Sequence, residues 1–401
     1  MIDTDKYRYD YTLPPGLLLV PDFPPMLGGI SSYLFNIYSN IDLSSLILVA
    51  SKEPGSEEFD ANQTYLPKRF TLPNLPPGFR WFGHMVKSYC EAQKIIKEKN
   101  GLVVHCGHIN AAILAYKLKK KYGTPYLVWT YASEIMDRLL YRNIKEALLN
   151  ADLVITISDF TQKYIESFGV APSKIIKIRP GTSPSYFNQE INKSQLESSL
   201  GIGGKRVLLT IGRFSRREQH KGQDMVIRAM PKILKAIPNL VYVLAGAGDD
   251  KGYYRQLAKK NGVQEHVKFI GKVADQDLPP LYNCCDVFIM CSREKREIRR
   301  NIVEGFGIVF LEASSAAKPV IGGNSGGVSE AVKDGFTGIL VDPANISDIA
   351  DAVVSLMTDS VLAQQYGRNG RAWVEKEMNW KRASKEFQEA YARCFPIPVI
   401  I

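Results

Sequence analysis

Two glutamates, Glu304 and Glu312, bracket a glycine-bearing loop that leads into an apolar helical segment. At the start of a helix, the free backbone N–H groups and the helix dipole both favour anionic oxygens. The amides of Phe306, Gly307 and Ile308 are therefore expected to hold phosphate or sugar oxygens. Both carboxylates then remain free to accept hydrogen bonds from neutral hydroxyls. A site that holds a phosphate beside several hydroxyl groups indicates a sugar nucleotide as the ligand.

Two cations stand where they would serve the same ligand. Arg213 follows the strand expected at 207–211, and Lys221 stands eight residues later, where a helical pattern begins. In open α/β sheets the carboxyl ends of the strands face the ligand crevice. A guanidinium and an ammonium that converge there would neutralise a diphosphate leaving group. The alternative is a pair of solvated loop cations.

Several glycine turns are further candidates for ligand contact. Gly28 and Gly29 follow the first expected strand and open a helix, so a ligand would approach their backbone closely. A tight strand-to-helix turn explains them equally well. Gly248 follows a later strand and fits a ligand loop or an ordinary turn alike. Lys272 and Val273 follow the next strand, where an exposed backbone would read the edge of a base.

The net charge of +10 suits polyanionic partners such as nucleotide phosphates or an anionic membrane surface. Lysines gather at 117–121, at the end of an amphipathic helical segment, and a second group of cations occupies 293–300. The first group fits peripheral contact with anionic lipid, or a surface helix that simply ends in cations. The second fits a lid, an acceptor contact or a solvated loop. The sequence has no recognisable nucleic-acid module, so no nucleic acid is expected as a partner.

Length and composition indicate a soluble protein of two domains. The 401 residues exceed one ordinary core, and 45% hydrophobic with 23% charged residues are globular values. The six cysteines form no CxxC pair, and no apolar run reaches the roughly 20 residues that span a bilayer. We therefore expect a cytoplasmic protein, free or peripheral on the inner face of the membrane. His105 and His108 have the spacing of metal ligands, but nothing nearby completes a site, so neither a metal nor a cofactor is expected.

Short β-rich runs alternate with helical patterns, which is typical of α/β proteins with parallel sheets. Strands are expected at 17–20, 46–50, 103–105, 126–130, 153–157, 175–178, 207–211, 241–245, 267–270, 287–290 and 320–322. A polar, Ser-rich stretch near 180–203 indicates a linker. The N-terminal domain is therefore expected at 1–190 and the C-terminal domain at 200–377, with the last helix, 378–401, assigned to the N-terminal domain.

Taken together, these residues resemble the retaining GT-B glycosyltransferases of glycosyltransferase family 4, over almost the whole chain. Glu304 and Glu312 match the family's EX7E pair, its most specific element. Arg213 and Lys221 match its paired diphosphate-binding cations, and the Gly28-Gly29 loop resembles its acceptor and phosphate loop. Within the family, the motifs look closest to phosphatidylinositol-mannoside mannosyltransferases and related bacterial enzymes.

The resemblance implies two Rossmann-like domains that face each other across a cleft, with a C-terminal helix that crosses back to the N-terminal domain. It implies transfer of a mannose- or glucose-type hexose from GDP-mannose or a UDP-hexose to a glycan or lipid-linked acceptor, in polysaccharide or glycolipid synthesis. The anomeric configuration would be retained and no metal would be needed. Arg213 and Lys221 would stabilise the departing diphosphate. Glu304 would bind sugar hydroxyls near the anomeric carbon, and Glu312 the ribose diol.

One position departs from the family pattern. Tyr131 stands at a strand end where relatives commonly carry a His that approaches the donor sugar. Its hydroxyl would take the same place, which makes Tyr131 a further candidate catalytic residue. The alternative is a GT-B protein that binds sugar nucleotides but has impaired catalysis. A non-hydrolysing epimerase or a phosphorylase on the same fold is a second enzymatic alternative.

Overall fold

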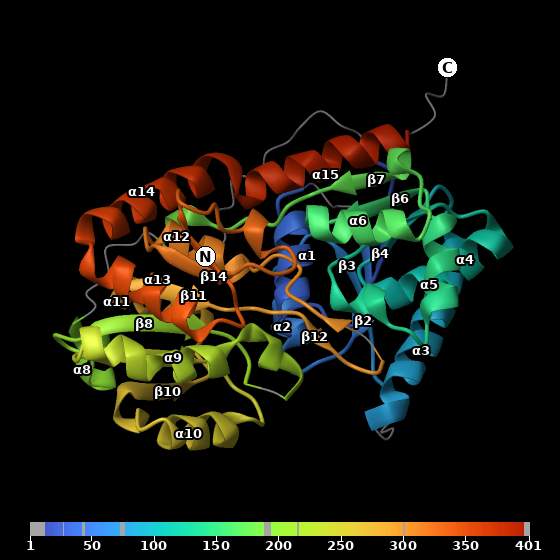
Figure 1. The fold of residues 1–401 in the computed structure, drawn as a ribbon. Coiled ribbons are helices and arrows are strands. Elements are labelled where there is room, and N and C mark those ends of the chain that lie inside the picture. The colour runs from blue at the N-terminus through green and yellow to red at the C-terminus, as the bar shows by residue number, and fades with distance from the viewer. Residues whose placement is uncertain are drawn as a thin grey trace. The chain divides into compact units, whose positions relative to one another are not determined.

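The computed structural model describes residues 13–26, 28–41, 45–72, 77–187, 194–214, 216–299 and 301–396, with the backbone alone at 77–80 and 216–218. The chain folds into two compact units (Figure 1). The first runs to Pro180 and resumes at Trp380, and the second is Gly181–Asn379.

The first unit is built on a parallel sheet that has seven strands in the described part of the chain. The strands are β1 (Gly16–Leu19), β2 (Ile47–Ser51), β3 (Leu66–Phe70), β4 (Val103–Cys106), β5 (Tyr126–Trp129), β6 (Leu153–Thr156) and β7 (Ile175–Lys177). The helices are α1 (Gly29–Ser39), α2 (Ser56–Asp60), α3 (Pro77–Glu98), α4 (Ile109–Tyr122), α5 (Tyr141–Leu149), α6 (Asp159–Ser167) and α15 (Trp380–Cys394), with 3-10 turns η1 (Ser133–Met136) and η2 (Pro172–Lys174).

The second unit repeats this plan with a six-stranded parallel sheet, again counted over the described residues. Its strands are β8 (Arg206–Ile211), β9 (Leu240–Ala245), β10 (Val267–Gly271), β11 (Val287–Met290), β14 (Val320–Gly323) and β15 (Gly338–Val341), and a separate hairpin is formed by β12 (Lys295–Arg296) and β13 (Asn301–Ile302). The helices are α7 (Pro184–Phe187), α8 (Ser194–Leu200), α9 (Gln223–Ala236), α10 (Lys251–Lys260), α11 (Leu278–Cys284), α12 (Ile308–Ser315), α13 (Ile346–Thr358) and α14 (Ser360–Glu377), with 3-10 turns η3 (Arg216–Lys221), η4 (Gln264–His266), η5 (Asp275–Asp277) and η6 (Val328–Glu330).

Both sheets have the doubly wound strand order of Rossmann folds. The first is ordered β3-β2-β1-β4-β5-β6-β7 and the second β10-β9-β8-β11-β14-β15. In each, the order reverses beside the first strand, between β1 and β4 or between β8 and β11. Ligands of such sheets bind beyond the carboxyl ends of the strands at this switch point. The expected α/β class with two Rossmann-like domains is confirmed.

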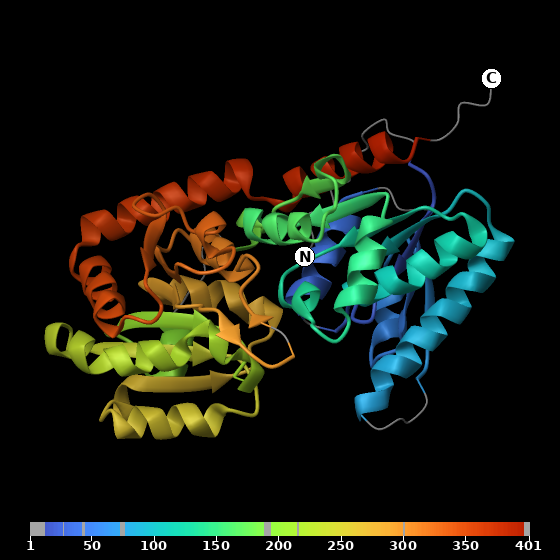
Figure 2. The ribbon, with the colours of Figure 1, turned by 45° about the vertical axis from the view of Figure 1, so that its right-hand side comes forward.

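The apolar runs form these strands because helices bury both faces of the sheets. In the first unit, α3, α4 and α5 pack side by side on one face (Figure 2). In the second unit, α9, α10 and α13 bury their apolar sides against the sheet in one contiguous core.

The C-terminal helix α15 belongs to the first unit, as expected, and packs on α1. The Ser384 hydroxyl donates to the Ile37 carbonyl at 3.1 Å, and the Phe387 ring lies 5.0 Å from that of Trp129. His105 is buried in this aromatic cluster, with its Nδ1 2.7 Å from the Tyr38 hydroxyl. His105 therefore has a packing role.

The stretch expected as a linker is instead part of the second unit. Its α7 contacts α11 and α12, and α8 contacts α11. Phe187 is buried with its ring 5.5 Å from that of Tyr282, and this apolar anchor holds the polar stretch to the unit.

No helix in the described ranges combines the length and the hydropathy that a membrane span requires.

Candidate active site

The sequence motifs of the second half converge at the switch point of the second sheet. Arg213 follows β8, and the segment from Cys291 to Glu304 follows β11, its immediate neighbour in the sheet. Lys221 ends η3, directly before α9. The topology therefore assembles the candidate residues where doubly wound sheets bind ligands.

Lys221 and Glu304 form an ion pair, although 83 residues separate them. The Lys221 Nζ donates to the Glu304 Oε2 at 2.9 Å, and the two side chains are 17% and 16% exposed. The aliphatic stem of Lys221 lies against Gly212, where a Cβ would come within 3.1 Å of its Cδ. An ammonium has three donors, so Lys221 can keep Glu304 and still donate to a phosphate oxygen.

Positive charge keeps Glu304 ionised. Burial by itself raises the pKa of this carboxyl, but the charges of Lys221, His220 and Arg213 outweigh it and hold the pKa below its ordinary value. Arg213 is exposed, and its carbonyl accepts a hydrogen bond from the buried Gln223 Nε2 at 3.4 Å. The site is thus a carboxylate set among cations at a sheet edge, where an added anion meets positive charge.

The loops after β8 and β9 contact each other backbone to backbone. The Phe214 N–H donates to the Ala247 carbonyl at 3.0 Å. A Cβ on Gly246, whose φ is +142°, would lie 1.9 Å from the Gly212 carbonyl oxygen, and one on Gly248 would lie 2.3 Å from the Phe214 carbonyl oxygen. Gly248 is therefore required for packing beside Arg213, and a role for it in ligand contact stays a prediction.

We expect Gly246→Ala to lower the free energy of unfolding by more than about 2 kcal/mol, because the added methyl group collides with backbone at a strained φ. Gly203→Ala is the matched control, since a Cβ there meets nothing within 4 Å. Denaturant unfolding of both variants checks this, and equal midpoints would contradict the packing argument.

Lys272 and Val273 follow β10, at the edge of the same sheet. Lys272 is exposed and Val273 half-buried. The Gly246 N–H donates to the Gly271 carbonyl at 2.6 Å, so this loop lies next to the one after β9. Its contact with a nucleotide base remains a prediction.

Helix α12 begins at the predicted loop. Gly307 is its N-cap residue, with φ +97°, a left-handed conformation that a side chain would strain. The Phe306 side chain is buried, which fixes the loop, and a role of its backbone in ligand contact stays a prediction. The Gly327 N–H donates to the Glu304 carbonyl at 3.0 Å and braces the residue before the helix. Ile308 is the first helical residue, as the anion-binding prediction requires.

Glu312 lies within α12 and has a different environment from Glu304. The Tyr282 hydroxyl donates to the Glu312 Oε2 at 2.6 Å. Burial raises the pKa of Glu312 to about 7, the Tyr282 hydrogen bond counteracts this rise, and the charge of Asp275 adds to it. The two glutamates therefore differ in their ionisation near neutral pH. Nearby cations stabilise the charge of Glu304, whereas the charge that acts on Glu312 is the anion Asp275.

A second ion pair fastens the basic segment 293–300 to the site. The two terminal guanidinium nitrogens of Arg293, Nη1 and Nη2, donate to the Asp224 carboxylate at 2.9 Å, and the Arg293 backbone N–H donates to the His220 carbonyl at 2.7 Å. These contacts hold both ends of the hairpin β12–β13 beside Lys221. Arg293, before β12, binds Asp224 on α9, and Glu304, after β13, binds Lys221.

In the first unit, Gly28 and Gly29 begin α1. Gly28 is the N-cap, and the Ser32 N–H donates to its carbonyl at 2.8 Å. A Cβ at either glycine meets nothing within 4 Å, so the protein's own packing does not require glycine there. This open backbone is consistent with the predicted close approach of a ligand.

Tyr131 lies in the interior of the first unit. It is buried, its hydroxyl donates to the Gly107 carbonyl at 3.0 Å, and its N–H donates to Glu134 at 2.5 Å. The hydroxyl that was expected to face a donor sugar is committed to this internal bond. This burial and this internal hydrogen bond argue against a catalytic role for Tyr131.

Sequence reasoning missed His220, Gln223, Asp224 and Tyr282, which position or tune the predicted residues. The side-chain contacts of Gln223, Tyr282 and Asp224 span from 10 to 69 residues along the chain. Isolated residues of these types carry no local signal. Only the Asp224 position, at the start of a helical pattern after Lys221-Gly222, was open to inference from sequence.

Two doubly wound units in one chain, one with cations and carboxylates paired at its switch point, define the GT-B class of glycosyltransferase. Comparisons with known proteins agree. Residues 28–186 match the family model "Glycosyltransferase Family 4", and residues 192–373 match "Glycosyl transferases group 1".

Curated relatives cover nearly the whole chain. A GDP-mannose-dependent alpha-(1-6)-phosphatidylinositol monomannoside mannosyltransferase of Mycobacterium tuberculosis is 31% identical over 91% of this chain and 94% of its own. The enzyme of the same name from Mycolicibacterium smegmatis is 30% identical over 93% and 97%. This chain belongs to the family 4 and group 1 glycosyltransferases and is a sugar-transferring enzyme. The alternative of a catalytically impaired binding protein finds no support among these relatives.

Solved structures share the fold. Anabaena HepE in complex with UDP and glucose superposes with a TM-score of 0.78 at 20% identity, covering 95% of this chain and 100% of its own. Sucrose-phosphate synthase from Thermosynechococcus elongatus gives 0.76 at 22% identity, covering 95% and 99%.

Proposed function

We propose that this enzyme transfers a hexose, with retention of the anomeric configuration and without a metal ion, from a nucleoside-diphosphate sugar to a lipid-linked or glycan acceptor. The observation that carries the proposal is the Lys221–Glu304 pair with Arg213 at the carboxyl edge of β8 and β11. The mannosyltransferase relatives, which are named for GDP-mannose and phosphatidylinositol monomannoside, favour GDP-mannose as the donor and a phosphoinositide glycoside as the acceptor.

The chemistry follows from where charge develops. When the bond from the anomeric carbon to the diphosphate breaks, its electron pair stays on the leaving oxygen. Lys221, Arg213 and the amides that begin α12 would stabilise that charge. Fixed cations of this kind would stabilise the negative charge that a divalent metal ion stabilises in other enzymes. The departing phosphate would take the proton of the attacking hydroxyl on the same face of the sugar.

The two glutamates would orient the donor. Glu304 is ionised and accepts hydrogen bonds, which suits hydroxyls of the sugar near the anomeric carbon. Glu312, within helix α12, would accept hydrogen bonds from the ribose diol. Gly28 and Gly29 would serve the acceptor or its phosphate. Neither glutamate acts as a nucleophile in this scheme.

A transfer assay tests the proposal. The purified enzyme is incubated in EDTA with GDP-mannose, UDP-glucose or UDP-galactose and with a phosphatidylinositol monomannoside acceptor, and NMR determines the linkage of the product. We expect one donor to be used, GDP-mannose, with an α-linked product. Transfer that stops in EDTA, or a β-linked product, would overturn the metal-free retaining mechanism.

A further inference from the structure

A buried arginine lies at the ligand edge of the first sheet, apart from the residues that the sequence motifs identified. Arg69 stands on β3, next to β2, and its side chain is 6% exposed. Its partner is Asp60, the last residue of α2, whose side chain is 8% exposed. The Arg69 Nε donates to the Asp60 Oδ2 at 2.6 Å, and the Nη2 donates to the Oδ1 at 2.8 Å. The pair therefore has the bidentate geometry of strong charge-assisted hydrogen bonds.

Further N–H groups of Arg69 bind the backbone beyond two neighbouring strands. Its Nη1 donates at 3.2 Å to the carbonyl of Ser51, the last residue of β2. Its Nη2 donates at 2.5 Å to the carbonyl of Pro24, which follows the end of β1. Since β1, β2 and β3 are parallel neighbours, these groups lie at the carboxyl edge of the sheet, where ligands of doubly wound folds bind.

The turn at 23–26 needs a donor from outside. Its two central residues are prolines, which have no N–H, so they can be held only through their carbonyls. Within the turn, the Met26 N–H donates to the Phe23 carbonyl at 3.3 Å. The Pro24 carbonyl receives its hydrogen bond from Arg69, so the guanidinium supplies a donor that this stretch of backbone lacks.

The same turn contacts the start of α1. The buried Ser31, in the first turn of this helix, donates through its Oγ to the Met26 carbonyl at 2.8 Å. Gly28 and Gly29 begin the helix, and their backbone is the part proposed to serve the acceptor or its phosphate. A continuous set of contacts therefore leads from Arg69 to the backbone of these two glycines.

The burial of this ion pair is not explained by stability. Two charges that leave water lose their hydration, and exchange of a buried pair for apolar residues of similar volume is often neutral or stabilising. Apolar side chains cannot, however, supply an N–H to the Pro24 carbonyl. The distinct contribution of the pair is therefore to fix the position of the turn.

We propose that Arg69 is a positioning residue for sugar transfer. Held by Asp60, it fixes the turn at 23–26 and with it the Gly28-Gly29 backbone that receives the acceptor. The inference rests on the proposed function for the role of these glycines. Loss of the guanidinium should weaken use of the acceptor, whereas the donor, which is proposed to bind the second unit, should bind as before.

Two variants separate positioning from stability. Asp60→Leu/Tyr65→Phe/Arg69→Met replaces the pair, and the Tyr65 hydroxyl that donates to Asp60 at 2.8 Å, by apolar groups of similar size. It keeps the packing and removes the donor to Pro24. Arg69→Lys keeps the charge but not the planar fork. For each, the acceptor KM is measured with phosphatidylinositol monomannoside at saturating GDP-mannose. GDP affinity is measured by calorimetry, and the unfolding midpoint in denaturant.

We expect the triple variant to raise the acceptor KM about tenfold or more, since a displacement of about 1 Å can cost up to about 100-fold. GDP affinity and the unfolding midpoint should stay near those of the wild type, and Arg69→Lys should give an intermediate rise in KM. Hydrogen exchange should quicken at the Met26 and Ser32 amides in both variants. Glu91→Gln/Lys94→Gln is the matched control, because it removes a 2.9 Å ion pair on α3 in the same unit. It should match the wild type in every measurement.

An acceptor KM that is unchanged in both variants would overturn the positioning role. An equal loss of GDP affinity, or a lower unfolding midpoint without a rise in KM, would overturn it too. If the triple variant does not fold, Arg69→Lys decides by the same measurements. A wild-type enzyme that transfers no sugar refutes the proposed function alone. The exchange rates then still test the inference, and unchanged rates in the variants would overturn it.

Discussion

Replacing Lys221 by alanine is expected to lower turnover by about 10²- to 10³-fold, the usual cost of removing one group that stabilises developing negative charge. The ammonium is held 2.9 Å from Glu304 at the switch point, so its position is fixed before the leaving group departs. The variant also leaves a largely buried carboxylate without its nearest cation. Burial then acts on the pKa of Glu304 with less opposition, and the pKa rises.

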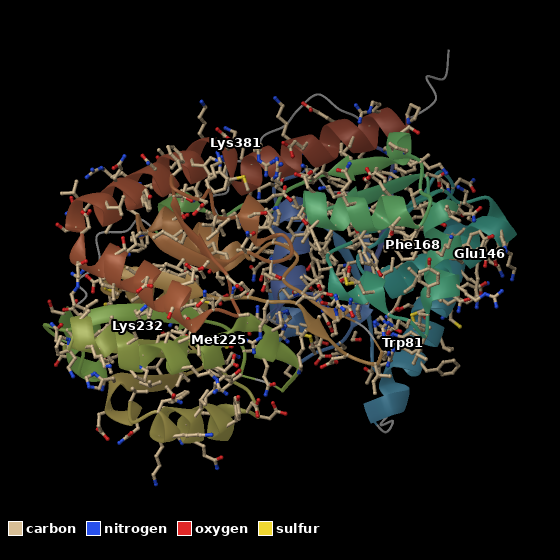
Figure 3. The ribbon with its side chains drawn as sticks, in the orientation of Figure 1. Trp81, Glu146, Phe168, Met225, Lys232 and Lys381 are labelled. Atoms are coloured by element: carbon tan, nitrogen blue, oxygen red, sulfur yellow. The ribbon has the colours of Figure 1, made fainter. Side chains whose placement is uncertain are left out.

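Single-turnover kinetics with saturating donor measures this effect on the chemical step. Lys232→Ala is the control, because Lys232 on α9 also pairs with a carboxylate, Asp351, at 2.7 Å but lies outside the site (Figure 3). We expect the control to turn over like the wild type and Arg213→Ala to resemble Lys221→Ala. Near wild-type rates for both site variants would remove the cations from the mechanism.

Glu312→Gln is expected to weaken donor binding by about tenfold or more, because hydrogen bonds to a charged group are worth roughly 1.5–3 kcal/mol. The ionised carboxylate accepts hydrogen bonds from the ribose diol more strongly than the protonated acid does, and its pKa is about 7. Wild-type donor affinity should therefore fall as the pH is lowered from about 8 to about 6, whereas the affinity of the variant stays flat. Calorimetric titration across this range measures both. Glu375→Gln, an exposed change on α14, serves as the control.

The same carboxyl has the opposite effect on stability. Its folded pKa lies above the ordinary value of 4.5, so the folded state binds the proton more tightly than the unfolded state. The unfolding free energy therefore falls as the pH rises from about 4.5 to about 7, and Glu312→Gln removes that loss. A variant that binds donor less well yet melts higher at alkaline pH is the expected signature. A lower melting temperature at every pH would show that Glu312 acts as a structural group.

Local patterns were sufficient to predict most of the two sheets and the site motifs. Apart from β3 and β15 (Gly338–Val341), the strands of both sheets were expected within a few residues of their observed bounds, because most of them are continuous apolar runs. β3 was missed because it is a half-exposed edge strand that contains Pro67 and charged residues. α3 was also missed, although its buried residues His84, Ser88, Ala92 and Ile95 recur at helical spacing.

Two kinds of contact account for the remaining differences: side-chain hydrogen bonds to nearby backbone, and contacts between residues far apart in sequence. The helical pattern over about 134–149 predicts a single helix, but the Glu134 carboxylate accepts from the Tyr131 and Ala132 N–H groups, and the Asp137 carboxylate accepts from the Leu139 N–H. These bonds divide the stretch into η1 and α5. The pairing of Lys221 with Glu304 depends on β8 and β11 becoming neighbours, which no local window reveals.

The central claim is that fixed cations, in place of a metal ion, hold the diphosphate of the donor. Calorimetric titration of GDP into the enzyme, with EDTA and then with magnesium, tests it most directly. We predict equal affinity in both conditions and a large loss in Lys221→Ala that magnesium does not restore. Binding that requires magnesium, or that is unchanged in the variant, would contradict the account.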